Sequence, residues 1–452
     1  MKKHIYRTCD VQQVQLKELL PALVGGCIVA LDVAKEKLVA AVATVTGEVL
    51  KLIRFDHPTQ TRQFLQLLEA LELGVGKNNL RVALEPTGTY GDAVRYQVAL
   101  RDIPVLMVSP KRTHDSRALF DNVSSLHDPK SAAQVAKLCS LELATAWKAE
   151  DATRTRLRAL VELRRHEGER YDTCLQRLES RLARHWPEFG QWLNTHAQVS
   201  ALHLLAEFGS PARVRREPEE ARELLRRASH GRLSAEVIDG LIEDTKETLG
   251  VPTSVEEHQY ITVLAKEALE SRRQREAIEK QMEAMCTDAA FRSLSAWMGT
   301  YTAAVLFSLC DPRQYSSAKE LVKACGLNLR EKSSGEHHGK LSITKRGPGL
   351  VRQVMYLFAL RMIAESPTVN AWYARRRGYT ETSRVSAVVA VMRKLVMASF
   401  HVARGAVFQP GRLFDERRLE LPVTSAQRRT PPEPRRQRRT KKRRGVTAAA
   451  SA

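Results

Sequence analysis

The sequence has few cysteines, and none of them is arranged for a structural task. Its seven cysteines are scattered, odd in number and never spaced as C-x-x-C; they are Cys9, Cys27, Cys139, Cys174, Cys286, Cys310 and Cys325. A disulfide framework needs paired cysteines, and a structural zinc site needs closely spaced ligands. The sequence therefore argues against both, and it indicates a reducing cytoplasm.

The sequence also lacks the long apolar runs of secreted and membrane proteins. Its N-terminus is basic, but no apolar stretch follows, so we expect no secretion signal. The most apolar stretch, residues 385–407, is interrupted by Arg393, Lys394 and Arg404. A bilayer-spanning helix rarely tolerates three such charges. We therefore expect no membrane among the partners.

Acidic residues are in the minority. The 452 residues include 72 Lys and Arg against 51 Asp and Glu, which gives a formal net charge of +21. This length predicts two or three domains, and a hydrophobic content of 43% excludes wholesale disorder. The excess of positive charge points to a polyanion as partner, because neutralising phosphates releases counterions and speeds encounter.

The first third of the chain has the pattern of an α/β domain. Short apolar runs at residues 27–33, 37–44 and 48–55 predict a three-stranded meander. Helical spacing follows, and two more strand-like runs at residues 80–85 and 104–108 flank a helical segment. We therefore predict an α/β domain over residues 25–150, preceded by an N-terminal extension over residues 1–24.

Beyond residue 128 the pattern becomes helical. Residues 151–186 and 256–285 carry apolar side chains at three-and-four spacing, which predicts two long amphipathic helices within a helical region at 151–288. They could form a coiled-coil arm, within one chain or between two chains, or a solvated helix pair inside a globular bundle. Residues 289–408 predict a mainly helical domain. Residues 409–452, rich in Arg, Lys and Pro, predict a disordered basic tail that grips phosphate without reading sequence.

Three acidic residues interrupt this pattern at the ends of elements. Asp32 ends the first predicted strand, Glu85 ends the fourth, and Asp128 begins the next helix. If the first and fourth strands are neighbours, these carboxylates converge and offer the hard oxygen ligands that Mg²⁺ or Mn²⁺ requires. The order of elements is typical of an RNase H-like fold. The alternatives are a helix cap for Asp128, a turn residue for Glu85 and a solvated strand end for Asp32.

Two sets of motifs resemble one known family. The first half contains A-L-D-V-A-K at 30–35, A-L-E-P-T-G-T-Y-G at 83–91, V-S-P at 108–110 and D-P-K-S-A at 128–132. The second half contains A-C-G-L-N-L-R-E-K-S-S-G at 324–335, I-T-K-R-G at 343–347 and L-V-R at 350–352. In this order they resemble the RuvC-like and serine-bearing domains of the one-ten family of bacterial insertion-sequence transposases. The resemblance spans roughly residues 25–408.

The resemblance implies a DEDD set of four metal-binding acids in the first domain. Asp32, Glu85 and Asp128 match the first three positions, and Ser131 stands at the fourth. A hydroxyl is a poor Mg²⁺ ligand beside a carboxylate and brings no charge. Either three acids suffice, with water in the remaining coordination position, or metal-dependent activity is weakened. We favour the first interpretation.

The resemblance also implies a serine nucleophile that bonds to the DNA phosphate. Ser333 and Ser334 precede Gly335 in a loop rich in cations, which suits attack on a phosphodiester because cations and backbone amides stabilise the transition state. Spacing from Gly326 and adjacency to glycine favour Ser334, with Ser333 second. On the residues alone, Ser-Ser-Gly is most often an ordinary surface turn.

Further cations are candidates for nucleic-acid binding. They are Arg330, Lys332, Lys345, Arg346, Arg352, Arg375, Arg376 and Arg377. The last three adjoin Trp372 and Tyr373, a combination suited to stacking and phosphate contact. The alternative is a helix C-terminus whose basic residues oppose the helix dipole, and Arg352 is equally well a solvated residue at a helix end.

The resemblance implies a transposase that excises and inserts its element by site-specific DNA recombination. It also implies a structured guide RNA encoded by the element and a homo-oligomer, a dimer or tetramer, in the nucleoid-associated cytoplasm of a bacterium. Two alternatives stay open. One is a metal-dependent junction nuclease or resolvase that uses the acids alone. The other is a catalytically weakened transposase relic that binds DNA or RNA. This alternative is suggested by Ser131, which stands where the family has a fourth acid.

Overall fold

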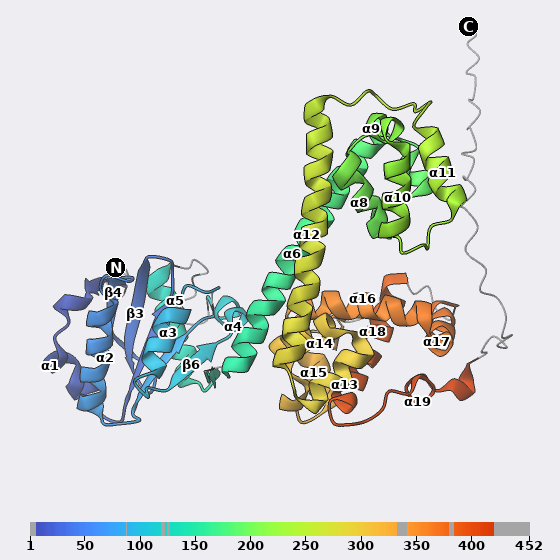
Figure 1. Cartoon of the computed structure of the whole chain (residues 1–452). Coiled ribbons are helices and arrows are strands. Elements are labelled where there is room, and N and C mark those ends of the chain that lie inside the picture. The colour runs from blue at the N-terminus through green and yellow to red at the C-terminus, as the bar shows by residue number, and fades with distance from the viewer. Residues whose placement is uncertain are drawn as a thin grey trace, which may run out of the picture. The chain divides into compact units, whose positions relative to one another are not determined.

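The computed structural model describes residues 6–86, 88–118, 123, 127–149, 151–331, 341–378 and 384–419. The chain forms two compact units, residues 1–151 and residues 152–452 (Figure 1). The division falls one residue beyond the boundary expected from the sequence. The first unit is a mixed α/β structure, and the described part of the second is almost entirely helical, as predicted.

The described part of the first unit is built on a seven-stranded sheet in the order β1-β4-β3-β2-β5-β6-β7. Its strands are β1 Thr8–Asp10, β2 Cys27–Asp32, β3 Lys37–Thr44, β4 Val49–Asp56, β5 Leu80–Leu84, β6 Val105–Val108 and β7 Ala144–Ala146. The predicted meander is β2, β3 and β4, which pair antiparallel. On the other side of β2, β5 and then β6 add in parallel. The expected neighbours, the first and fourth predicted strands, therefore do pair.

Helices cover both faces of this sheet. Along β2, Val29 and Leu31 face one hydrophobic core together with α2 Thr61–Val75 and α3 Asp92–Ala99. Ile28 and Ala30 face the other core, which α5 Asp128–Ser140 completes. Because β2 is buried on both faces, its sequence is an almost unbroken apolar run, and Asp32 is its first polar residue.

Residues of the expected N-terminal extension belong to this unit. β1 pairs in parallel with β4, and Val11, Leu19 and Leu23 are buried in the same core as α2. These three come from the short helical segments η1 Val11–Gln13 and α1 Leu16–Leu19 and the end of η2 Leu20–Ala22. The chain therefore contributes to the sheet before its first predicted strand.

The second unit is organised by two long helices, α6 Ala152–His185 and α12 Val255–Met285. They run antiparallel within the chain (Figure 1), since Arg164 pairs with Glu279 at 2.8 Å and His185 lies 3.2 Å from Glu257. Both helices are where the sequence predicts them. The coiled-coil arm is not confirmed, because each end of the pair is embedded in a globular helical core, as in the bundle alternative.

One of these cores is made by helices between α6 and α12. They are α7 Phe189–Trp192, α8 Val199–Phe208, α9 Pro211–Arg216, α10 Pro218–Ala228 and α11 Ala235–Asp244. Trp186 is 1% exposed and Leu175 is fully buried in this core. The indole of Trp192 donates a hydrogen bond to Asp244 at 2.6 Å. Residues 187–254 therefore fold as a helical cluster against the long pair.

The other core is C-terminal. Its helices are α13 Ala289–Met298, α14 Thr300–Cys310, α15 Ala318–Ala324, α16 Gly349–Glu365, α17 Pro367–Gly378, α18 Arg384–Val402 and α19 Pro410–Phe414. A small hairpin, β8 Leu329–Arg330 and β9 Ser342–Ile343, stands before α16. In the described residues, α18 alone has the length and hydropathy of a membrane span, yet Val391 and Leu395 are buried in this core. We therefore interpret α18 as the central core helix.

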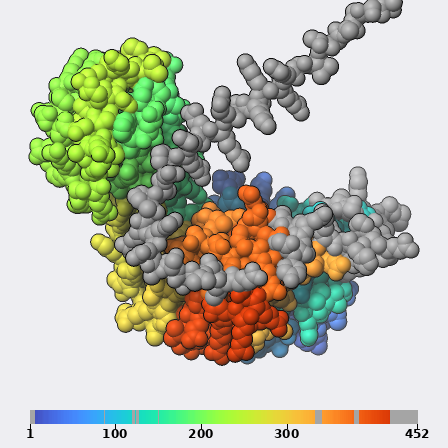
Figure 2. Space-filling model, turned by 90° about the vertical axis from the view of Figure 1, so that its right-hand side faces the viewer, coloured from blue at the N-terminus to red at the C-terminus, as the bar shows by residue number. Residues whose placement is uncertain are grey.

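The expected disordered tail from residue 409 is not confirmed. Residues 410–418 form α19 and a turn of 3-10 helix, η4 Glu416–Arg418, and Phe414 is 1% exposed in the C-terminal core. This part of the second unit is coloured orange to red in Figure 2. The remaining tail, residues 420–452, lies outside the described residues.

Candidate active site

Asp32 and Glu85 lie at one edge of the sheet. Asp32 is the last residue of β2, and Glu85 comes directly after β5. Since these strands are parallel and Leu31 is in register with Leu84, the two acids follow at equivalent positions. Both side chains are half-buried. The sheet therefore brings two of the predicted acids together.

Asp128 approaches the same edge from α5. It is the first residue of this helix and is exposed. The alternative that Asp128 caps the helix is wrong, because the capping residue is His127, whose ring accepts a hydrogen bond from the backbone amide of Lys130 at 3.3 Å. The Asp128 carboxylate is therefore not used as the helix cap.

The negative charges of Asp128 and Glu85 both act on the Asp32 carboxyl. The pKa of the Asp32 carboxyl is raised from its ordinary value of 3.8 to about 6, first by burial and then by the negative charge of Asp128. Glu85 raises it further, although less than Asp128 does. A carboxylate pKa responds in this way when like charges are near and water is partly excluded. The structure thus gathers the predicted acids into one electrostatic site.

Ser131 joins this site in an unexpected role. It lies one helical turn after Asp128, is 6% exposed, and its hydroxyl group lowers the pKa of the Asp32 carboxyl because it favours the ionised form. This effect, with that of the Val33 backbone amide, opposes part of the rise in the pKa of Asp32. The sequence identified Ser131 as a missing acid but gave no sign of this effect, which depends on how α5 packs on β2.

The donor set fits a hard divalent cation. Carboxylates are the hard oxygen ligands that such a cation takes, and the charges of Asp128 and Glu85, after burial, contribute to the raised pKa of Asp32. Among the residues that the structure describes, no three His, Cys, Asp or Glu side chains converge closely enough to enclose an ion by themselves. An ion bound here would take water or substrate oxygens among its ligands, as Mg²⁺ commonly does.

The predicted serine nucleophiles cannot be placed. Ser333, Ser334 and Lys332 lie outside the described residues. The hairpin that flanks them is described: Leu329 pairs with Ile343 and Arg330 with Ser342. The Arg330 guanidinium also donates to the Ser342 hydroxyl at 3.4 Å. The two ends of the serine loop are therefore held side by side in the second unit.

Lys345 and Arg346, which follow the serine loop, pack closely against the backbone at Gly326. The Lys345 amide donates to the Gly326 carbonyl at 2.9 Å, and Lys345 has a positive φ of 55°. Gly326 also has a positive φ, and a Cβ there would lie 2.9 Å from the backbone of Arg346. Arg352 donates to the Gly347 carbonyl at 2.7 Å. Arg352 thus braces the start of α16, a contact that the sequence did not predict.

Arg375, Arg376 and Arg377 occupy the last turn of α17. The Arg375 guanidinium donates to the Arg418 carbonyl, and Arg377 lies 5.9 Å from the ring of Tyr373. In sequence, these residues lie more than thirty positions after the β8–β9 hairpin. The predicted cations therefore form two groups within the second unit.

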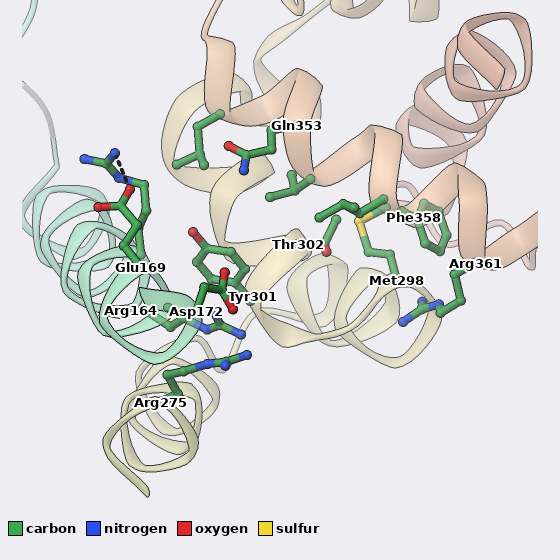
Figure 3. Close-up of a pocket in the computed structure, with 15 residues that line it drawn as sticks. Arg164, Glu169, Asp172, Arg275, Met298, Tyr301, Thr302, Gln353, Phe358 and Arg361 are labelled. Carbon is green, nitrogen blue, oxygen red and sulfur yellow. Dashed lines mark hydrogen bonds and ion pairs between the residues drawn. The ribbon is translucent and has the colours of Figure 1, made fainter. Parts of the chain in front are cut away.

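A cavity that sequence reasoning missed lies where α6, α12, α14 and α16 meet (Figure 3). Its volume is about 400 Å³. Arg164 lies 4.3 Å from the ring of Tyr301, and burial together with the charge of Arg164 lowers the pKa of Arg275. One wall, on α16, is mainly apolar. In the sequence, Arg164 appears only as an arginine within an amphipathic helix. That pattern is the same whether the arginine lines a cavity or lies on a solvated face.

Comparison with known proteins assigns both parts of the chain. Residues 29–187 match a family model described as a transposase, the DEDD domain of IS110 elements, which covers Asp32, Glu85 and Asp128. Residues 291–374 match the model described as "Transposase IS116/IS110/IS902 family", which covers the serine hairpin and α16. No curated protein matches the chain. A DEDD transposase domain depends on a divalent metal ion. With both domains present in this order, the chain belongs to the IS110 family of DNA transposases.

Proposed function

We propose that this transposase excises and inserts its own element by site-specific DNA recombination, using Asp32, Glu85 and Asp128 as Mg²⁺ or Mn²⁺ ligands and Ser334 as nucleophile, with Ser333 as the second candidate. The single observation that carries the metal site is the parallel register of β2 and β5, which places Asp32 and Glu85 at equivalent positions on one edge of the sheet, where the charge of Asp128 also reaches Asp32. The serine assignment rests on the family resemblance and on the cationic sequence around the loop.

The three acids have to be ionised to hold the ion. Burial and the charges of its two neighbours disfavour the charged form of Asp32. The ion, when bound, stabilises charge that develops on phosphate oxygens. Ser131 favours the ionised form of Asp32, and water would fill the position that a fourth acid would take.

The serine acts on the scissile phosphate. Its hydroxyl loses a proton, its oxygen forms a bond to phosphorus, and the displaced sugar oxygen takes up a proton. Arg330, Lys332, Lys345 and Arg346 are near this serine in sequence and supply positive charge for the phosphate oxygens. Reversal of this step on a different strand end joins the recombined DNA.

Partners follow from the same proposal. The net charge of +21 supports binding of element and target DNA, and of a structured guide RNA that would choose both by pairing. We propose a homo-oligomer, a dimer or tetramer, in which the RuvC-like domain of one subunit meets the serine domain of another. Activity in the cytoplasm, associated with the nucleoid and without a membrane partner, follows from the DNA substrate.

The experiment is a search for DNA attached to protein. Protein, candidate flanking RNA and DNA are incubated with Mg²⁺ and then denatured. We expect a covalent product with wild type, its loss in Ser334→Ala or in the Ser333→Ala/Ser334→Ala double variant, and its retention in Ser293→Ala, an exposed serine on α13. Cleavage that survives in the double variant would instead identify a junction nuclease that uses the acids alone.

One observation favours a second candidate, the weakened relic that only binds nucleic acid. The fourth acidic position is occupied by a buried hydroxyl, which reduces the negative charge available to the metal. For a relic, DNA and RNA binding persists while no product forms with Mg²⁺ or Mn²⁺, and Ser131→Asp restores product formation. Product formed by the wild type excludes this candidate.

A further inference from the structure

A second cavity in the second unit collects cations from separate elements. It has a volume of about 410 Å³ and lies among α17, α18 and the α19–η4 segment, in the part coloured orange to red in Figure 2. The basic residues in its lining are Arg375 and Arg376 of α17, Lys394 of α18 and Arg418 of η4. Among the described lining residues the one acid is Asp415. We call this space the α17–α18 cavity.

Lys394 carries its charge in a partly dry position. Its ammonium group lies 5.4 Å from the ring centroids of both Trp372 and Phe414 and donates to the Leu413 carbonyl at 2.8 Å. Burial lowers the pKa of Lys394, and the charge of Asp415 raises it only in part. A half-buried ammonium group gains more from an anion than an exposed one does, because the intervening dielectric is lower.

The positive charge of the cavity is not balanced by its own acid. Asp415 forms an ion pair with Arg418 at 3.0 Å. Arg376 forms no hydrogen bond or ion pair with any residue in the described ranges of the chain. With Arg418 paired to Asp415, the charges of Arg376 and Lys394 leave an excess of positive charge on the described lining.

The helix dipole accounts for only part of this arrangement. Basic residues in the last turn of α17 are stabilised by the partial negative charge of the helix C-terminus. That explanation does not reach Lys394, in the middle of α18, or Arg418, which comes from η4. Bringing like charges from three elements to one cavity costs free energy unless an anion is bound there.

We propose that the α17–α18 cavity binds a backbone phosphate of nucleic acid. The guanidinium groups of Arg375, Arg376 and Arg418 suit bidentate contact with phosphate oxygens, and Lys394 supplies a point charge at the base. The volume accommodates a phosphate with part of its sugar. The proposal rests on the proposed function only in taking the phosphate to belong to DNA or RNA. It gives Lys394 and Arg418 a phosphate-binding role that the sequence did not indicate.

The test measures how binding depends on salt. The full chain with Arg376→Gln/Arg418→Gln is compared with wild type, using a short DNA duplex and a single-stranded RNA as separate probes. Each phosphate contact contributes about 0.9 to the salt slope for duplex DNA and about 0.7 for single strands. We expect the slope to fall by about one to two, and the probe whose slope falls identifies the source of the phosphate.

A matched control removes the same charge elsewhere. Arg272→Gln/Arg273→Gln on α12 also loses two positive charges, from exposed side chains that line none of the cavities described above. Its slope should stay near that of wild type. Equal slopes for wild type and the cavity variant with both probes, or an equal fall in the control, would overturn the proposal.

Two further measurements separate this proposal from others. Lys394→Gln should lower the slope and Lys394→Arg should retain it, with thermal melting used to check that both variants fold. The binding assay involves no strand exchange, so its result is independent of covalent product formation. An altered slope without any product contradicts the proposed function alone, whereas product formation with an unaltered slope contradicts the cavity assignment alone.

Discussion

The hydroxyl group of Ser131 lowers the pKa of the Asp32 carboxyl and so opposes the rise caused by burial and by the charges of Asp128 and Glu85. This effect links α5 to the end of β2 at the edge where Glu85 also lies. An ionised acid at position 131 could only accept hydrogen bonds and would add a fourth negative charge. The serine therefore brings no charge to a bound metal, but it stabilises the ionised form of Asp32.

Metal affinity should fall in mild acid. Because the pKa of Asp32 in the metal-free protein is about 6, a divalent ion has to displace a proton below that pH. We expect affinity for Mn²⁺ to fall about tenfold per pH unit below pH 6 and to level off above it. Calorimetric titration at pH 5 to 8 measures this. Asp32→Asn should bind weakly with a flatter profile, and a wild-type profile without a bend near pH 6 would contradict the pKa.

The same shift predicts how stability changes with pH. The folded-state pKa of Asp32 lies above its ordinary value, so its contribution is fully present below about pH 3.8 and is lost as pH rises through about 6. The Asp32→Asn variant cannot ionise at this position. As pH rises from 4 to 7, its free energy of unfolding should therefore increase relative to that of wild type. Urea unfolding across that range measures the difference. Added Mg²⁺ should reduce it, because bound metal stabilises the ionised carboxylate only in wild type.

The two neighbouring acids should affect Asp32 unequally. The charge of Asp128 raises the pKa of Asp32 more than that of Glu85 does. Asp128→Asn should therefore lower this pKa further than Glu85→Gln, and both should lie below wild type. Carboxyl-detected NMR titration of Asp32 gives the order. Glu36→Gln, an exposed acid in the same unit, serves as the control and should leave the titration unchanged.

Substitutions of Ser131 should move metal affinity and stability in opposite directions. Ser131→Asp adds a fourth carboxylate and should tighten Mn²⁺ binding, yet it buries another charge and should destabilise the metal-free protein by about 1–3 kcal/mol. Ser131→Ala removes the hydroxyl that favours the ionised form of Asp32 and should raise the pKa of Asp32 without adding a ligand. Metal titration and urea unfolding are measured on the same samples. Tighter metal binding in Ser131→Ala would refute this role of the hydroxyl.

The sequence predicted this site because strand ends are visible in a sequence. The apolar run of β2 ends at Asp32, the run of β5 ends before Glu85, and parallel neighbours bring such ends together. The effect of Ser131 on Asp32 was not predictable, since it depends on the packing of α5 against β2. Strand β1 was missed because three residues are too few to show a period of two.

The C-terminal half shows the same limit. The long helices α6 and α12 have an extended three-and-four spacing and were predicted, whereas the short helices of residues 187–254 were not placed individually. Lys394 appeared in the sequence as an interruption of an apolar stretch. Its aromatic neighbours, Trp372 and Phe414, lie on other helices, so the α17–α18 cavity required the tertiary structure.

The pairing of α6 with the helical cluster of residues 187–254 offers a test of the second unit. Leu175 on α6 is fully buried in that core, whereas Leu163 on the same helix is 48% exposed. Leu175→Ala should lower the free energy of unfolding of this unit by about 2–5 kcal/mol, because a buried cavity is left behind. Leu163→Ala makes the same chemical change at the surface and should cost about 0.5 kcal/mol or less.

Urea unfolding followed by tryptophan fluorescence measures both, since Trp186 lies in the same core as Leu175. Equal effects of the two substitutions would show that Leu175 is not packed between α6 and the cluster, and the helix pair would then have to be exposed along its length, as in a free arm.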